Sequence, residues 1–560
     1  MNILIITLNL KEKRIMPLTR RKLLNALIPA SIISFFTTKD AFSDVTLGKK
    51  SKVDIQNENI ISQTDTSKTL RILDSLDGAS KVRARNNETV EQSLQTLDSK
   101  MLKLEKFVFK DDFEVAEQYN IPGDFTDLQE AINHLSNRNA SANKYIILNI
   151  QSGYRISSGV KVQHGDYSRF YIQSEDSIVY IADDFEGVSG PDGKNTITDG
   201  TVILAYHARG PVLGCIIDGR SIARTLYLAL GGSHGWSDRL KSRTEEKPNL
   251  KKIAGGKNFL HATFLAQESS VIICENSTAT NCHLHSIYCE RNSMIHAEFS
   301  DVSNSRLGGV VVTRGGMVNA DTVIADGCTV GFWAHRQGVI SASDSSANNC
   351  KGNGYRADTG GRINAHNTSA SNTSNSATID KWKYGGVGYL ALRGGEIICT
   401  GKSKANNCIY GLMSIFGAKI SAYQIISINC KISAIACMDG SQIEADESLI
   451  DNAKSIGVHC RDGSSVSLRA ATIKNSGKYS ILAEFGSNIS GRNILISNAG
   501  DTCVYSKGGS RVDIFSGVVV NGEYFDLKVT DGSTISASKA VFSKTNIEKN
   551  KNNQNGIIFC

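Results

Sequence analysis

Four residues in the middle of the sequence have side chains whose types and spacing could act on a sugar polymer. Trp333 and His335 stand two residues apart, and Arg356 and Asp358 stand two apart in the next similar segment. A tryptophan ring offers a flat face to a sugar ring, and an arginine can hold a sugar carboxylate through two hydrogen bonds. A histidine beside an aspartate is held in one tautomer and becomes more basic. This set could support β-elimination from a uronic acid, with His335 as the base, or it could be a solvated pair with Trp333 covered by a loop.

Hydrolysis of a glycosidic bond would need two carboxyl groups instead. Glu298 and Asp321 occupy equivalent positions in neighbouring segments. If these segments stack as adjacent strands, the two backbones lie about 5 Å apart, which suits a retaining pair. The recurrence of acids at such positions favours an ordinary exposed ladder over a pair that does chemistry.

A long loop between two of the segments could add binding contacts. The segment that begins at Gly354 has 34 residues, about twelve more than its neighbours, and the excess within Asn367–Gly385 includes Trp382 and Tyr384. Long insertions in solenoid proteins lie on the surface and often form the binding site. We therefore expect Trp382 and Tyr384 to contact a bound sugar. The first half of the loop, rich in Ser and Asn, is at least as typical of a disordered segment.

These segments are units of a repeat with a period of about 22–24 residues that begins near residue 283. When the first residue of each unit is numbered zero, position six is nearly always glycine and position nine is usually Ile or Val. The glycines are Gly315, Gly360, Gly394, Gly417, Gly440, Gly463, Gly486, Gly508 and Gly532. The apolar positions are Val318, Ile340, Ile363, Ile397, Ile420, Ile443, Val466 and Ile489. Several units end in Asn-Cys.

A single unit of this kind cannot bury its own apolar face, whereas stacked units form a continuous core. The repeat therefore predicts an all-β chain that folds as a right-handed parallel β-helix of about 11–13 coils. The Leu-x-x-Leu-x-Leu frame of a leucine-rich repeat is absent, and a propeller would need a longer period. Alternate residues of each first strand point outward. Trp333 should then lie next to Arg356, and His335 next to Asp358, on the outer face of adjacent coils.

The N-terminal segment carries most of the excess positive charge. The chain has a formal charge of +7, and residues 1–43 contribute about +5, with seven cations and two acids. Arg20 and Arg21 precede a moderately apolar run from Ala26 to Phe36, which is typical of a twin-arginine export signal. That run is too short to span a bilayer, and no other stretch is apolar for long enough, so we expect no membrane span. The nearly neutral remainder indicates no nucleic-acid partner.

The 13 cysteines are an odd number, and most of them lie within apolar strand patterns. Buried thiols behave as small hydrophobic side chains. Because the sequence contains no Cys-x-x-Cys pair, we expect neither a metal site nor a redox site, and no cofactor.

Six segments can be distinguished along the chain. They are an export-signal-like segment (1–43), a polar linker with a short helical part (44–108), the start of the β-helix with a capping helix (109–225), a lateral loop insertion (226–257), the repeated coils (258–545) and a polar tail (546–560). Thr126 or Asp127 can cap the helix. A helix at this end would cover the apolar cross-section of the first coil.

Three stretches near the start of the predicted β-helix resemble a known superfamily. They are GDFTDLQEAINHL (Gly123–Leu135), SGVKVQHGDYSRFYIQSEDSIVYI (Ser158–Ile181) and GPVLGCIIDGRSIA (Gly210–Ala223). The first resembles the opening of pectate-lyase-like β-helix proteins, and the other two resemble phage or prophage tailspike and tail-fibre proteins. The Trp-Ile-Asp-His signature of secreted pectate lyases is absent, so none of their functional residues can be placed on this sequence.

The resemblance implies a carbohydrate-directed protein, often a capsule or O-antigen depolymerase that acts as a polysaccharide lyase or glycoside hydrolase. It would place the protein in a virion tail, whereas the N-terminal segment predicts export to the cell surface. A non-catalytic glycan-binding adhesin and a structural tail-fibre or spike are the alternatives, because fold does not imply function. The expected partner is a cell-surface polysaccharide, and a homotrimer is one candidate assembly.

Overall fold

The chain divides into two units, Met1–Phe113 and Glu114–Cys560. The computed structural model describes residues 46–47, 82–83, 115–136, 145–176, 178–188, 200–219, 223, 225–237, 241–243, 262–282, 284–376, 384–543, 547–549 and 556–559. In the first unit these are two short antiparallel strands, β1 (Thr46–Leu47) and β2 (Val82–Arg83). The export-signal-like segment 1–43 and most of the linker 44–108 lie outside the described residues.

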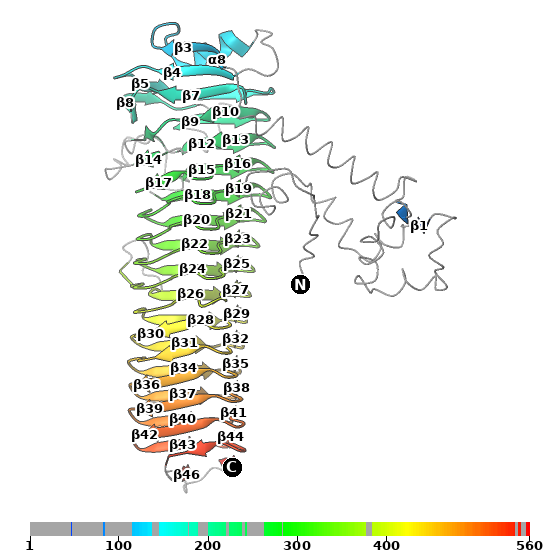
Figure 1. Ribbon diagram of the computed structural model, residues 1–560, viewed down its shortest axis with the longest axis vertical. Helices are drawn as coiled ribbons and strands as arrows, with labels where there is room; N and C mark the ends of the chain where they lie inside the picture. Colours follow the sequence, from blue (N-terminus) through cyan, green and yellow to red (C-terminus); the bar gives the residue numbers. More distant parts are fainter. Residues whose placement is uncertain are drawn as a thin grey trace, which may run out of the picture. The chain divides into compact units, whose positions relative to one another are not determined.

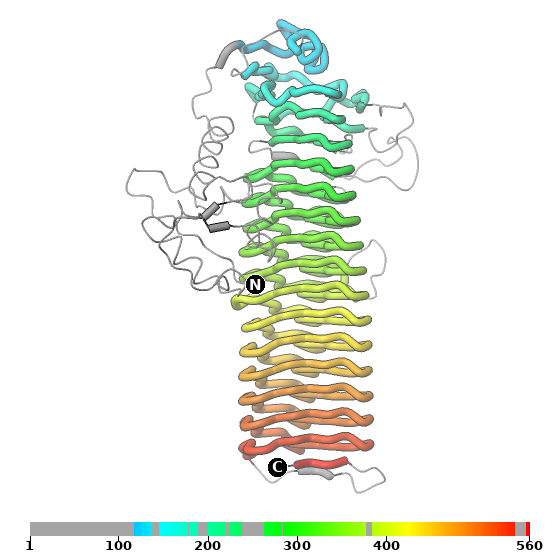
Figure 2. Tube along the Cα trace, turned by 90° about the vertical axis from the view of Figure 1, so that its right-hand side faces the viewer, coloured from blue at the N-terminus to red at the C-terminus, as the bar shows by residue number. Residues whose placement is uncertain are grey.

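The second unit is an all-β parallel β-solenoid of about 15 turns (Figures 1 and 2). This is more than the 11–13 coils expected, because the coils before residue 283 carry the signature only in part. The coil with Gly232 at position six has no closing Asn-Cys, and the coil closed by Asn281-Cys282 has Ser269 at position six. The right-handed sense of the coil stays a prediction. Each turn adds strands to up to three sides of the solenoid.

The first side, called the long sheet below, is a 16-stranded parallel sheet. Its strands are β6 (Val160–Gln163), β9 (Thr201–Tyr206), β12 (Thr225–Leu230), β15 (Ala262–Gln267), β18 (His285–Glu290), β20 (Gly308–Thr313), β22 (Val330–His335), β24 (Asn353–Asp358), β26 (Val387–Leu392), β28 (Tyr410–Ile415), β31 (Ser433–Cys437), β34 (Ile456–Arg461), β37 (Tyr479–Glu484), β40 (Thr502–Ser506), β43 (Phe525–Val529) and β46 (Ile547–Lys549).

The second side is also parallel, and each strand between the end strands β3 and β47 pairs with the preceding and the following coil. Its strands are β3 (Val115–Ile121), β4 (Tyr145–Ile150), β7 (Phe170–Ser174), β10 (Arg209–Leu213), β13 (His234–Ser237), β16 (Val271–Ile273), β19 (Met294–His296), β21 (Met317–Asn319), β23 (Val339–Ser341), β25 (Arg362–Asn364), β27 (Glu396–Ile398), β29 (Lys419–Ser421), β32 (Gln442–Glu444), β35 (Ser465–Ser467), β38 (Asn488–Ser490), β41 (Arg511–Asp513), β44 (Thr534–Ser536) and β47 (Ile557–Phe559).

The third side has a 5-stranded and a 6-stranded parallel sheet, joined by single β-bridges from Thr278 to Ile426. The strands are β5 (Arg155–Ser158), β8 (Val179–Glu186), β11 (Ile217–Asp218), β14 (Lys241–Arg243) and β17 (Thr278–Thr280), then β30 (Ile426–Ile428), β33 (Leu449–Asp451), β36 (Thr472–Ser476), β39 (Leu495–Ala499), β42 (Val518–Gly522) and β45 (Val541–Phe542).

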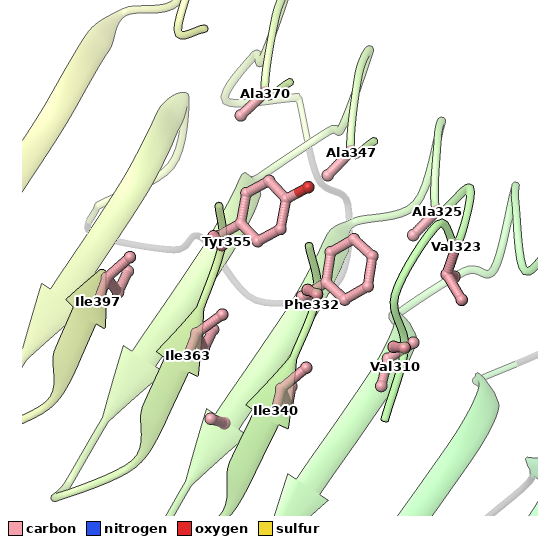
Figure 3. Close-up of a cluster of buried hydrophobic side chains, with 14 of the residues drawn as sticks. Val310, Val323, Ala325, Phe332, Ile340, Ala347, Tyr355, Ile363, Ala370 and Ile397 are labelled. Atoms are coloured by element: carbon pink, nitrogen blue, oxygen red, sulfur yellow. The ribbon is translucent and has the colours of Figure 1, made fainter. Parts of the chain in front are cut away.

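The interior is built of side-chain ladders, as the repeat predicts. The position-nine residues Ile340, Ile363 and Ile397 pair directly from coil to coil and are fully buried. Phe332 and Tyr355 stack with their ring centroids 4.8 Å apart. Figure 3 shows both kinds of ladder facing the same interior. Because each rung contacts the next across about one strand spacing, the core is continuous along the solenoid.

The recurring glycine at position six belongs to the turn between the first and second sides. Arg393 and Gly394 both have left-handed backbone angles, with φ of 48° and 72°. Two such residues in succession form the kind of turn in which glycine is strongly favoured. The cysteines also behave as predicted, because every cysteine that the structure describes is a buried thiol in no disulfide.

An α-helix, α8 (Leu128–Ser136), follows β3, and Figure 1 shows it beside β3 and β4 at the N-terminal end of the solenoid. Its role as a cap of the first coil stays a prediction. The Asp127 side chain accepts a hydrogen bond from the Glu130 backbone N–H at 2.8 Å, which is the geometry of an N-cap. Leu128, Ile132 and Leu135 are buried and join the core of the first coils.

Regular strands lie within two of the segments that the sequence assigned to a loop and a tail. The lateral loop was expected to cover 226–257, but β12, β13 and β14 form a coil that pairs on both sides. Its Tyr227 and Ala229 are fully buried in the core, and residues 244–257 of the expected loop lie outside the described residues. The expected polar tail 546–560 contains β46 and β47, which continue the stack, and its Ile558 extends the isoleucine ladder.

Candidate functional site

The outer face of the long sheet brings the four residues together in the expected register. Trp333 on β22 pairs with Arg356 on β24, and His335 pairs with Asp358. All four lie on the outer face because their neighbours Phe332, Ala334, Tyr355 and Ala357 are fully buried in the core. The spacing of the two repeat units therefore predicted the neighbours correctly.

Arg356 connects the tryptophan to the aspartate. Its guanidinium lies over the Trp333 ring, 5.3 Å from the ring centroid. One of its nitrogens donates to Asp358 Oδ2 at 2.8 Å, and the Arg356 side chain is only 11% exposed. Burial lowers the pKa of Arg356, while the hydrogen bond and charge of Asp358 act against that shift. An arginine engaged in this way has little surface left to hold a ligand carboxylate, which was its expected role.

Asp358 does not orient His335, contrary to the sequence-based expectation. Its carboxylate accepts hydrogen bonds from Arg356, from Arg393 at 3.2 Å and from the Thr359 hydroxyl at 3.0 Å. Among the described contacts, none is a hydrogen bond to His335. Burial alone would raise the pKa of Asp358, but the arginines and Thr359 outweigh it and hold that pKa below its ordinary value. The arginines outweigh the effect of burial on this pKa because they donate charge-assisted hydrogen bonds to the ionised carboxylate.

Arg393 is the residue of this site that the sequence did not reveal. It lies in the turn after β26, and its side chain is 58% exposed while it bridges back to Asp358 in the preceding coil. The sequence contains only a weak indication of this role. Arg393 lies between the outward-pointing Leu392 and the position-six glycine, Gly394, of the next unit. Trp333, His335, Arg356, Asp358 and Arg393 are called the outward cluster below.

His335 is a half-buried imidazole in cationic surroundings. Its ring centroid lies 5.8 Å from that of Trp333, and its Nδ1 is buried without a hydrogen-bond partner in the structure. Burial lowers the pKa of His335; the Asp358 charge opposes this shift, and the charges of Arg336, Arg356 and Arg393 add to it. The lowered pKa favours the neutral ring, so His335 can accept a proton.

A second buried acid lies two strands before His335 along the same row of the long sheet. Glu290 accepts a hydrogen bond from Gln267 at 2.6 Å and pairs with Arg314 at 3.3 Å. Burial, and next the Glu290 charge, raise the pKa of Tyr288 to about 12. The Glu290 carboxylate is thus already paired with Gln267 and Arg314.

The alternative pair, Glu298 and Asp321, lies in adjacent coils, because the Phe299 N–H donates to the Asp321 backbone oxygen at 3.1 Å. Asp321 Oδ1 accepts the Ser341 hydroxyl and the Ser343 N–H, both at 2.8 Å. Asp326 and Asp446 bind the next coil in the same way, through a serine hydroxyl and a backbone N–H. This recurrence supports a role for Asp321 in joining coils.

The long loop is only partly described. Trp382 lies outside the described residues, and Asn367–Ser371 continues the regular coil rather than forming part of the insertion. Tyr384 packs against an apolar patch of the long sheet that includes Leu390 and Leu392. These two leucines pair with Arg356 and Asp358, so Tyr384 lies over the coil next to the outward cluster.

Two further findings concern metals and membranes. No group of three or more His, Cys, Asp or Glu side chains within the described ranges is placed to hold a metal ion. Of the helices in the part of the chain that the structure describes, none is long and apolar enough to cross a membrane.

Comparisons with known proteins add little to this picture. No family model matches the sequence, and no curated protein matches it either. Among solved structures, the chain is similar to the catalytic unit of a thermostable GH87 α-1,3-glucanase from Streptomyces thermodiastaticus, with 11% identity and a TM-score of 0.26. The match covers 72% of this chain and 64% of the glucanase chain, so less than two thirds of that chain is spanned. Function is therefore inferred from the outward cluster of a parallel β-solenoid.

Proposed function

We propose that the protein binds an acidic cell-surface polysaccharide at the outward cluster and cleaves it by β-elimination. The observation that carries the proposal is the environment of His335, a base with a lowered pKa among arginine side chains. A neutral base next to fixed positive charge is what proton removal beside a carboxylate requires.

The arrangement assigns different roles to the arginines. Both arginines pair with Asp358, but Arg393 is largely exposed and can neutralise the carboxylate of a uronic acid, whereas Arg356 is nearly buried. Neutralising the carboxylate makes the adjacent C5–H more acidic, and His335 takes this proton. The C4–C5 double bond then forms as the C4–O bond breaks, and the departing oxygen takes a proton from the imidazolium or from water. Asp358 holds Arg356 and Arg393 in place, and Trp333 offers its remaining exposed surface to a sugar ring.

Elimination is expected to leave an unsaturated sugar at the new end of the chain. Purified protein should be incubated with a panel of capsular and O-antigen polysaccharides, with and without uronic acids. We expect an increase in ultraviolet absorbance only with uronic acid substrates. New reducing ends without this absorbance would contradict elimination and favour hydrolysis.

The missing hydrogen bond between Asp358 and His335 supports a second candidate, a glycan-binding adhesin without cleavage. Its base would lack the orienting partner that general-base catalysis commonly uses. Binding of a polysaccharide with no product in either assay would establish this candidate.

Cleavage is expected to persist into mildly acidic solution. Because the pKa of His335 is lowered, its basic form is present above that pKa and is lost as the pH falls through it. We therefore expect the acidic limb of the kcat/KM profile below the ordinary histidine value of about 6.5. An acidic limb clearly above that value would show that another group is the base.

We also propose that the protein acts outside the cytoplasm, either exported by its twin-arginine-like segment or as a tailspike-like part of a virion. Replacing both Arg20 and Arg21 with lysine should abolish export through a pathway that requires the arginine pair. The measurement is the amount of protein in the periplasm and at the cell surface, compared with the cytoplasm. Normal export of the double variant would refute the twin-arginine interpretation.

A further inference from the structure

A second group of polar and aromatic side chains occupies the same outer face, far from the outward cluster. The row that carries Trp333 continues in register through His459 on β34 and Leu482 on β37 to Tyr505 on β40 and Lys528 on β43. Tyr505 is seven strands from Trp333, or about 34 Å at the usual strand spacing. This group is therefore separate from the proposed site.

Three lysines lie against the aromatic rings of this region. Lys507 and Lys528 place their Nζ atoms 5.6 and 5.5 Å from the centroid of the Tyr505 ring. Lys478 Nζ lies 5.0 Å from the Tyr479 centroid, and the two tyrosine rings are 5.6 Å apart. These five residues are called the lysine–tyrosine cluster below.

A buried carboxylate holds one of the lysines in position. Glu484 Oε1 pairs with Lys507 Nζ at 2.5 Å, and Glu484 Oε2 lies 2.7 Å from His459 Nε2. Burial alone would raise the pKa of Glu484, but its bonds to Lys507 and His459 hold it below the ordinary value. The same hydrogen bond raises the pKa of Lys507. Lys507 is thus charged and ordered before any ligand arrives, which lowers the entropic cost of binding.

The three lysines differ in their acidic neighbours. Glu484 compensates Lys507, and Glu548 on β46 pairs in register with Lys528, whereas Lys478 is exposed and forms no ion pair with any described residue. Lys478 thus gives the cluster an excess of positive charge. Lys528 lies over both Tyr505 and Phe525, 5.0 Å from the centroid of the latter. Each of these three coils therefore carries a lysine beside an aromatic ring.

We propose that the lysine–tyrosine cluster is a second binding site for an anionic saccharide, distinct from the outward cluster. Tyrosine rings offer apolar faces to the C–H side of a sugar ring. Lysine ammonium groups act as point charges for carboxylates without the planar geometry that arginine demands. This inference rests on the proposed function in one respect, since it assigns the cluster to the same acidic polysaccharide and gives it the role of retaining the chain rather than cleaving it.

The test compares binding of polygalacturonate with binding of its methyl-esterified form, which lacks the charge. We expect the wild type to bind polygalacturonate more tightly, with an affinity that falls as salt is added. Tyr505→Ala should weaken this binding by about tenfold, and Tyr505→Phe, which keeps the ring, should not. Lys528→Met should weaken it as well. Lys404→Met removes an exposed lysine beside the third side and should have no effect.

Several outcomes would overturn the proposal. They are wild-type binding by a folded Tyr505→Ala variant, equal binding of the esterified polymer, and no binding of polygalacturonate by the wild type. Circular dichroism checks that the variants fold. If Tyr505→Ala weakens binding while the wild type releases no unsaturated product, the second site stands and the cleavage proposal fails. If the wild type releases unsaturated product and Tyr505→Ala binds normally, the cleavage proposal stands and the second-site proposal fails.

Discussion

Replacing His335 with alanine is expected to lower the turnover of an acidic polysaccharide by roughly 100-fold or more, the usual scale for loss of a general base. His335 is the residue of the outward cluster that can act as the base. Its pKa is lowered, so the imidazole is held in the neutral form that accepts a proton. The measurement is kcat from the initial rate of unsaturated product. Binding of the polysaccharide should change little, since the arginines that meet its charge remain.

Two further variants make this result specific. Trp333→Ala should chiefly raise KM, because it removes a stacking surface and no proton-transfer group. Glu298→Gln should leave cleavage intact, since Glu298 belongs to the alternative pair for hydrolysis. Loss of activity in Glu298→Gln but not in His335→Ala would reverse the assignment and favour glycoside hydrolysis.

Replacing Ile420 with aspartate is expected to lower the free energy of unfolding by about 3–5 kcal/mol. Ile420 is fully buried and pairs in register with Ile397 and Ile443, so a carboxylate there has neither water nor a cation to compensate it. Denaturation with guanidinium chloride, followed by circular dichroism, measures the change.

The control for this substitution lies in the neighbouring coil. Gln442 is exposed on β32, next to the buried Ile443, and pairs in register with Lys419. Gln442→Asp should leave the free energy of unfolding nearly unchanged. Equal stability of Ile420→Asp and the wild type would show that the ladder residues do not face the core.

Much of the architecture follows from the sequence alone. Units of nearly equal length stack with a fixed strand spacing, so residues at the same position in successive units become neighbours. This is why the isoleucine ladder and the left-handed glycine turns appear where the repeat predicts them. It is also why Trp333 meets Arg356, and His335 meets Asp358, in register.

The same rule fails where the repeat pattern is degenerate. The strands β12, β13 and β14 form a coil that has the position-six glycine, Gly232, but no closing Asn-Cys, because their alternating apolar residues suffice to fill the core. At the C-terminal end, Ile557–Phe559 supplies a ladder strand after a run of Lys and Asn that reads as a tail.

Only the tertiary structure decided which side chains pair on the outer face. The register places His335 beside Asp358. The Asp358 carboxylate, however, accepts hydrogen bonds from Arg356 on its own strand and from Arg393 in the turn of the next coil. The histidine–carboxylate bond forms instead between His459 and Glu484, which are diagonal rather than opposite neighbours. Strand spacing and register determine which backbone positions become neighbours. Long charged side chains reach across several of these positions, so competition among nearby hydrogen-bond donors determines their partners.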